Sequence, residues 1–230
     1  MSPKQNRLIE LLPRKDRLHF VAQCEEVDLV LSDVLSEPDT PTRHVYFPTK
    51  GFISLVSIVE SNPPLEVGMV GREGMLGAQL ALGVTNSLLH ALVQGQGTAW
   101  RISGAAFRRE LALSAPLQKI IHHYLYVLMA QMAESAGCLR YHQISSRLAR
   151  WLLMSQDRAE SNNFRVTHEF LAYMLGVRRV GITAAAIDLQ RSGLIEYRRG
   201  NLTVLDRHGL VGAACGCYAA DQKTYAKQLG

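Results

Sequence analysis

The chain has 230 residues, of which 47% are hydrophobic, so it can bury a substantial core in one large or two modest domains. No run approaches the roughly 18 apolar residues that span a bilayer, and the N-terminus lacks an apolar signal core, so we expect a cytoplasmic protein with no membrane partner. Residues 1–139 carry 12 basic and 13 acidic side chains (net −1) and residues 140–230 carry 13 and 7 (net +6), which favours a polyanion as partner of the C-terminal part.

The N-terminal part reads as two short helices followed by a β-rich region. Residues 3–22 are expected to form one or two helices. From Val27 to about Ile102 the chain carries short apolar runs such as HVYF, FISLVSIV, LEVGMV, SLLHALVQ and TAWRI. Turn residues separate these runs, as in PTKG, ESNPP, VGREG and GQG. Many short strands with frequent turn signals are typical of an antiparallel sandwich or barrel.

A long helix is expected next. Ser103 can cap a short helix, and Ser114 can cap a long one that has Pro116 in its first turn. Apolar side chains then recur at three- and four-residue spacing. Such a stripe commonly packs on its own domain, but it can also pack on the same helix of a second subunit. We expect a homodimer whose interface includes Ile121, Leu125, Leu128 and Met132.

An amphipathic helix over residues 142–159 leads to the stretch Val166 to Asp206, which predicts two short helices and a β-hairpin. Thr167 can cap the first helix, and Gly176 can end it in the left-handed conformation. In the second helix Ile182, Ala185, Ala186 and Leu189 share one side, and Val180, Ala184, Ile187 and Arg191 share the other. The segment RRGN then joins LIEY to LTVL as a hairpin. Together these elements predict a winged helix-turn-helix; a purely structural helical hairpin is the alternative.

Two arginines, Arg178 and Arg179, begin the second helix, where the helix dipole disfavours cations by roughly 0.3–1 kcal/mol each. A phosphate or a guanine edge would offset that cost. Double-stranded DNA is therefore the expected partner. The residues expected to contact it are Thr167, His168, Arg178, Arg179, Val180, Thr183, Ala184, Arg191, Arg198 and Arg199.

A second candidate site is the glycine-rich turn Gly71, Arg72, Glu73 and Gly74. Glycines permit close backbone approach to a ligand, and the turn offers one cation and one anion. These four residues are the candidate contacts for a small-molecule effector of unknown identity. The alternative is a tight turn with a local ion pair.

No metal, cofactor or catalytic site is expected. Cys138 and His142 lie four apart on an expected helix, but zinc needs about four such ligands. Cys215 and Cys217 are interpreted as small buried residues of a C-terminal helix, and a redox-active pair is the alternative. Cys24 is the only cysteine upstream of the long helix, which disfavours an iron–sulfur cluster, whereas a haem would need only one axial histidine. Dinucleotide, Walker, HExxH and GxSxG motifs are absent from the sequence, so an enzyme is not expected.

The order of these features resembles the Crp/Fnr superfamily of bacterial transcription regulators. The most specific parts are VGREGMLG, SSRLARWLLMSQDR and LAYMLGVRRVGITAAAIDLQRSGLIEYRRGNLTVLDR, and the resemblance covers essentially the whole chain. It implies an α+β fold with an N-terminal antiparallel β-roll of the cyclic-nucleotide-binding type, a dimerisation helix and a C-terminal winged helix-turn-helix. The corresponding segments are residues 1–113, 114–140 and 141–230. It also implies RNA polymerase as a partner if the protein is an activator.

The chain is more similar to a separate subgroup of the superfamily than to the cyclic-AMP receptor itself. Alignment on Gly77 places Ala78 where the receptor has a ribose-binding glutamate, and no Lys or Arg lies between Arg72 and Arg101 to hold a cyclic phosphate. We therefore expect no cyclic-AMP binding of the usual kind. Arg179 matches the family's base-reading arginine, whereas the next readers are Val180 and Ala184, which can contact thymine methyl groups but cannot read guanine or cytosine.

Two other functions stay open at this level. The first is a cyclic-nucleotide or other small-molecule binding module without transcriptional output, against which the basic winged helix argues. The second is an enzyme that uses the β-roll as a catalytic barrel, against which the absence of a catalytic constellation argues.

Overall fold

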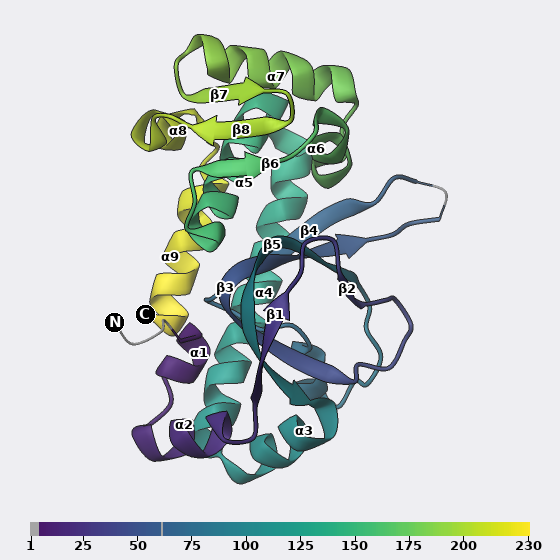
Figure 1. The fold of residues 1–230 in the computed structure, drawn as a ribbon, viewed down its shortest axis with the longest axis vertical. Coiled ribbons are helices and arrows are strands. Elements are labelled where there is room, and N and C mark those ends of the chain that lie inside the picture. The colour runs from purple at the N-terminus through teal and green to yellow at the C-terminus, as the bar shows by residue number, and fades with distance from the viewer. Residues whose placement is uncertain (1–4, 61) are drawn as a thin grey trace.

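The computed structural model of the protein describes residues 5–60 and 62–230 (Figure 1). A β-roll occupies one end of the molecule, a smaller unit of helices and three strands occupies the other, and a long helix, α4 (Ala115–Tyr141), runs along the roll. The strands of the roll are β1 (Glu25–Leu29), β2 (Val34–Ser36), β3 (His44–Ser57), β4 (Leu65–Val70) and β5 (His90–Ser103). Two short helices precede them, α1 (Arg7–Glu10) and α2 (Arg14–Val21); residues 3 and 4 of the predicted helical segment lie outside the described residues.

The roll is antiparallel, with strand order β1-β5-β3-β4 and β2 also paired to β5. Its two long strands replace what the sequence predicted as several short ones. Within β3, Pro48 and Gly51 sit where the pairing with β5 changes register, so they bend the strand without ending it. A Cβ on Gly51 would lie 2.3 Å from the carbonyl oxygen of Gly95, so this close crossing of two strands requires glycine.

Two helices complete this half of the molecule after the 3-10 helix η1 (Ala78–Leu82). The hydroxyl of Ser103 accepts from the backbone amide of Ala106 to begin α3 (Gly104–Leu113), and Ser114 accepts from that of Leu117 to begin α4. These are the two N-caps that the sequence predicts. Tyr124 of α4 is fully buried against the roll and α3, so α4 is part of the core of this half.

The C-terminal unit has its own hydrophobic core. Its elements are α5 (Ile144–Ala159), β6 (Asn163–Arg165), α6 (His168–Leu175), α7 (Arg179–Arg191), β7 (Ile195–Arg198), β8 (Asn201–Val204) and α8 (Arg207–Ala213). Leu152 of α5 is buried together with Leu171, Ile182 and Leu202. The sheet order is β6-β8-β7, which adds one strand to the predicted hairpin.

The last helix, α9 (Cys217–Leu229), leaves the C-terminal unit and packs along α4 toward the N-terminal helices (Figure 1). Leu229 is buried beside Leu8 and Ile9, and its carbonyl oxygen accepts from Arg7 Nε at 3.2 Å. Residues assigned by sequence to the C-terminal domain therefore also tie the two ends of the molecule together.

Within the described residues, no single helix is long and apolar enough to cross a membrane. The pair α6 and α7 reaches that length and composition only together, and it is bent by 107° at its turn.

Candidate nucleic-acid interface

Helices α6 and α7 meet at a sharp, well-defined turn. Thr167 Oγ1 accepts from the backbone amide of Phe170 at 3.1 Å and so caps α6. Gly176 ends that helix in the left-handed conformation, with φ of 59°. Val177 and Arg178 then lead into α7, which is bent by 107° relative to α6. This is the geometry of a helix-turn-helix, with α7 in the position of the recognition helix.

The two faces of α7 divide as the sequence predicts. The side chains that anchor the helix are buried in the C-terminal core: Ile182, Ala185, Ala186 and Leu189. The opposite face is open, with Val180 exposed at 72% and Ile187 at 44%. Figure 1 places α7 along the outer edge of the molecule, where a duplex could reach it. Ala184 and Arg191 are exposed on this same face.

Both arginines at the start of α7 are exposed. Arg178 is the N-cap residue but makes no side-chain capping bond, and Arg179 is the first residue of the helix. The first turn of α7 holds no acidic side chain. The positive end of the helix and two guanidinium groups therefore coincide, which concentrates positive charge at the edge of this face.

His168 and Thr183 link α6, α7 and the wing. His168 Nδ1 lies 3.0 Å from Thr183 Oγ1, and Thr183 donates to the carbonyl oxygen of Arg179 at 3.1 Å. The imidazole stacks on the ring of Tyr197 in β7, with centroids 4.5 Å apart. Burial and then the charge of Arg179 lower the pKa of His168, so the ring is neutral near pH 7. His168 thus positions α7 against the wing.

The wing ends in a two-residue turn. Arg198 pairs with Asn201 in the ladder, and Arg199 (φ 50°) and Gly200 (φ 82°) form the turn between them. A left-handed arginine is unfavourable, and turns of this kind usually carry Asn, Asp or Gly instead. Arg165 of β6 pairs with Asn201 from the other side, so a further exposed arginine lies beside the tip. Sequence reasoning missed Arg165, although its place just before the α6 cap was a usable signal.

The glycine-rich turn Gly71–Gly74 does not leave its charges free for an effector. Arg72 donates to the Gln5 carbonyl oxygen at 2.7 Å and to the Glu10 carboxylate at 2.9 Å. Glu73 pairs with Arg158 of α5 at 2.7 Å. These partners, which include residues of α1 and α5, were not predicted from the sequence, either as effector contacts or as a local ion pair within the turn. A Cβ on Gly74 would lie 2.5 Å from the Tyr124 hydroxyl, so this glycine is required for packing.

The four residues expected at a dimer interface have different surroundings. Ile121 is fully buried in its own chain, in a cluster with Phe107 and Leu111 of α3. Its side chain is therefore not accessible to a second subunit. Leu125, Leu128 and Met132 are half-buried. The most exposed apolar side chains of the same face are Tyr126 (57%) and Met129 (69%), which sequence reasoning overlooked because they fall between the members of the buried stripe.

An apolar cavity of about 260 Å³ lies between α4 and the roll. Its walls include Leu125, Leu128 and Met132, together with Ala78, the residue aligned with the receptor's glutamate. The side chains that line it are aliphatic or uncharged, and the polar ones are Gln79, Asn86 and Ser87. A ligand placed here meets no cationic side chain among these wall residues.

Glu66 joins the two ends of the molecule. It lies on β4, and its carboxylate accepts from Ser54 Oγ and from Trp151 Nε1 of α5, the latter at 2.9 Å. Burial raises the pKa of Glu66 to about 7, although both hydrogen bonds oppose the shift. Between about pH 4.5 and 7, Glu66 therefore keeps a proton in the folded state that the unfolded chain has released. The contribution of Glu66 to the free energy of unfolding consequently falls as pH rises through that window.

Replacing Glu66 with glutamine is expected to abolish the loss of folding stability between about pH 4.5 and 7. Glutamine keeps an acceptor for Trp151 but carries no charge, so Glu66→Gln should be more stable than the unmodified chain by on the order of 2 kcal/mol near pH 8 and nearly equal near pH 5. Urea unfolding followed by tryptophan fluorescence measures both. The matched control is Glu25→Gln, because a bond from Arg101 lowers the pKa of Glu25. An alkaline loss that persists in Glu66→Gln would contradict the assignment.

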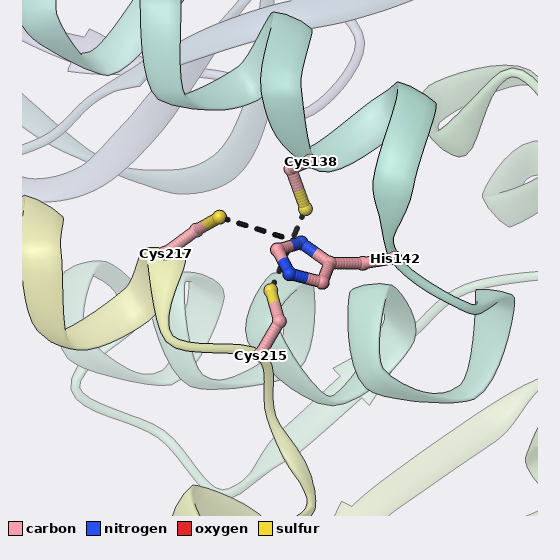
Figure 2. A group of neighbouring side chains, drawn as sticks. All are labelled: Cys138, His142, Cys215 and Cys217. Carbon is pink, nitrogen blue, oxygen red and sulfur yellow. Dashed lines mark hydrogen bonds between the residues drawn. The ribbon is translucent and has the colours of Figure 1, made fainter.

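The four residues that the sequence treats as two separate pairs come together in space. Cys138 and His142 lie beside Cys215 and Cys217, and their ligand atoms are all within 4.8 Å of one another (Figure 2). His142 follows α4 instead of lying on it, and Cys215 precedes α9. The fold therefore brings together four side chains of the kinds that bind zinc, whereas the sequence offered only two at one place.

Comparisons with known proteins agree with this architecture. Residues 146–212 match the family model of the Crp-like helix-turn-helix domain. The chain is 24% identical over 188 residues to the global nitrogen regulator of Synechocystis sp. (strain ATCC 27184 / PCC 6803 / Kazusa), and the match covers 73% of this chain and 78% of that protein.

Solved structures share the whole fold. FixK2 from Bradyrhizobium japonicum superposes with a TM-score of 0.70 at 12% identity, and the match covers 84% of this chain and 98% of that one. The c-di-GMP responsive global regulator CLP of Xanthomonas campestris gives 0.68 at 18% identity, covering 84% and 100%. A CRP/FNR family regulator from Thermus thermophilus gives 0.64 at 21% identity, covering 83% and 98%.

A β-roll joined through a long helix to a winged helix-turn-helix defines a class of DNA-binding transcription regulators. Residues 146–212 match the Crp-like helix-turn-helix family, and the chain as a whole is similar to regulators of the Crp/Fnr type.

Proposed function

We propose that the protein acts as a homodimer that binds a specific, pseudo-palindromic DNA operator and regulates transcription from it. One observation carries the proposal: α7 presents Arg179, Val180 and Ala184 on an open face beside a wing whose tip residue, Arg199, is held in the left-handed conformation. Arg179, at the edge of this face, is suited to reading one guanine, and the small apolar side chains of Val180 and Ala184 are suited to contacting thymine methyl groups in the groove. The arginines of the wing suit phosphates.

The dimer would form through the exposed ridge of α4. Tyr126, Met129, Ala133 and Ala136 are exposed at three- and four-residue spacing, next to the half-buried Leu125 and Met132. An apolar ridge of this kind is stabilised by packing on its own copy, which would place two α7 helices in successive major grooves. Half-site centres about 34 Å apart follow from that arrangement.

Cyclic AMP is not the effector in this proposal. The cavity beside α4 has an aliphatic lining, and an unpaired phosphate in such a place would lose its hydration without gaining a cation. Calorimetric titration of the purified protein with cyclic AMP should therefore give no binding in the micromolar range. Micromolar affinity would overturn this part. The lining favours an apolar small molecule as effector, if one exists.

Two other functions receive less support. A small-molecule module without transcriptional output would have no use for the strained arginine of the wing or for two arginines at the start of α7. Enzymatic activity is not part of the proposal, because the residues that line the apolar cavity include no acidic or basic side chain. If the protein activates transcription, RNA polymerase would be a further partner.

Selection of bound sequences from random DNA by the purified protein tests the proposal. We expect enrichment of one inverted repeat whose half-sites are spaced by one helical turn or a multiple of it. Recovery of unenriched DNA, at the affinity of non-specific binding, would reject sequence-specific regulation. Enrichment of a single half-site would reject the dimer and leave the reading helix in place.

A further inference from the structure

A group of four metal-ligating side chains lies where the long helix α4 ends. Cys138 belongs to the last turn of α4, and His142 is the residue that ends this helix. Cys215 lies in the turn after α8, and Cys217 is the first residue of α9. Figure 2 shows the four side chains converging from these two parts of the chain.

The distances are those of a four-coordinate site that is nearly closed. Cys138 Sγ lies 3.5 Å from Cys215 Sγ, and Cys217 Sγ lies 3.5 Å from His142 Nδ1. A tetrahedral zinc with bonds of about 2.3 Å to sulfur and about 2.0–2.1 Å to nitrogen separates its ligand atoms by roughly 3.5–3.8 Å. Two edges already have that length. The widest separation, 4.8 Å or less, needs to close by only about 1 Å.

We propose that Cys138, His142, Cys215 and Cys217 bind one zinc ion in a structural Cys₃His site. Four protein ligands fill the tetrahedral shell and leave no open position, as in structural sites and unlike catalytic ones. The three cysteines are buried and the histidine is exposed, so the metal would sit at the rim with a short path from solvent. Soft thiolate ligands favour zinc over magnesium or calcium.

The surroundings suit the charge of such a centre. Zinc with three thiolates carries a net charge of −1. Arg147 and Arg150 of α5 both interact electrostatically with Cys138 and Cys215. Arg150 is also paired with Asp221 of α9 at 2.6 Å, which links α5 to α9. These cations would offset the negative charge that forms when metal binding displaces the thiol protons into solvent.

The metal would join three elements that govern the orientation of the DNA-reading unit. Cys138 lies in the last turn of α4 and His142 in the link between α4 and α5, where the long helix passes into the C-terminal unit. Cys217 begins α9, which packs along α4. Zinc would therefore fix the position of α7 relative to α4. This consequence for DNA rests on the proposed function, whereas zinc binding itself does not.

The experiment starts from the reduced, full-length protein. Elemental analysis should find about one zinc per chain, and Cys215→Ser and Cys217→Ser should each lower it to about a tenth or less. Cys24→Ser is the matched control, because Cys24 lies in the β-roll half and outside the group, and it should retain its zinc. Non-reducing mass spectrometry and an assay for acid-labile sulfide accompany the metal analysis.

A cobalt titration covers the case in which the serine variants fail to fold. Chelator-treated, unmodified protein should take up one Co²⁺ and develop the intense visible bands of a tetrahedral thiolate complex, which zinc then displaces. Removal of the metal should lower the melting temperature, and added zinc should restore it.

Three outcomes would overturn the site: no cobalt spectrum from the reduced chain, iron with acid-labile sulfide in place of zinc, or a Cys138–Cys215 disulfide as the resting state. Operator affinity is measured separately, with and without the metal. Full zinc occupancy without any DNA binding would reject the proposed function and leave the metal site intact.

Discussion

Met129→Glu is expected to convert the proposed homodimer to a monomer and to weaken operator binding by a factor of about 10²–10⁴. Met129 is 69% exposed in the single chain, so a carboxylate there costs the protomer little. In the proposed dimer it would face its own copy, where two buried like charges are strongly unfavourable. A monomer binds only one half-site. It therefore loses the additional affinity that a dimer gains when its two linked reading units bind both half-sites together. Sedimentation and operator titration measure the two effects.

This variant is a sharper test than charges at Leu125 and Leu128. Those two side chains line the apolar cavity, so a charge on either could disturb the protomer itself. Leu113→Glu is the control, because Leu113 is 77% exposed at the end of α3 and should leave assembly unchanged. An unmodified chain that sediments as a monomer at tens of micromolar would refute the interface, as would a dimeric Met129→Glu.

Arg179→Ala is expected to remove discrimination at one base pair of each half-site. Arg179 is exposed at the start of α7, where the proposed bidentate contact with guanine would contribute roughly 1–3 kcal/mol of specificity. The mutant should bind the matched operator and the operator mismatched at that position with nearly equal affinity. Penalties at the other positions should persist, because Val180 and Ala184 would still meet the groove.

The wing should behave differently. Arg198→Ala combined with Arg199→Ala is expected to weaken all sequences to a similar extent, because phosphate contacts carry no base information. The slope of log affinity against log salt should become shallower by about one unit for each phosphate that the variant no longer neutralises. Arg108→Ala combined with Arg109→Ala, which removes two exposed cations from α3, controls for net charge.

Titrations of these variants against matched and singly mismatched operators, at several salt concentrations, separate the two roles. If Arg179→Ala left every mismatch penalty unchanged, α7 would not be the reading helix that its exposed face suggests. If the wing variant altered one mismatch selectively, the wing would contact bases.

Local sequence rules correctly predicted where several helices begin and end. Ser103, Ser114 and Thr167 begin helices, and Gly176 ends one, because each satisfies or terminates a backbone hydrogen-bond ladder within a few residues. The buried side of α7 follows from the 3.6-residue period of its apolar residues. Such features depend on neighbours in the chain, so the order of β-rich region, long helix and winged helix can be predicted without knowing any distant contact.

Local signals failed where distant backbone decides the conformation. Pro48 and Gly51 look like turn residues, yet β3 continues through them because β5 pairs with it on both sides of the register shifts. The continuity of a strand depends on its partner, which the local sequence does not identify. Likewise, Ile121 and Met129 both belong to an apolar helix, but only the packing of α3 determines that the first is buried and the second exposed.

By itself, the sequence determined the elements of the DNA-reading unit, because caps, breaks and periodicity are properties of contiguous residues. Only the tertiary structure decided which charged and metal-ligating groups meet. Glu73 of the glycine-rich turn pairs with Arg158 of α5, and Cys138 meets Cys215 across 77 positions. The return of α9 along α4 creates the second of these encounters. Ion pairs and ligand shells depend on distances in space, and those distances are fixed by how the helices pack and not by the spacing of residues along the chain.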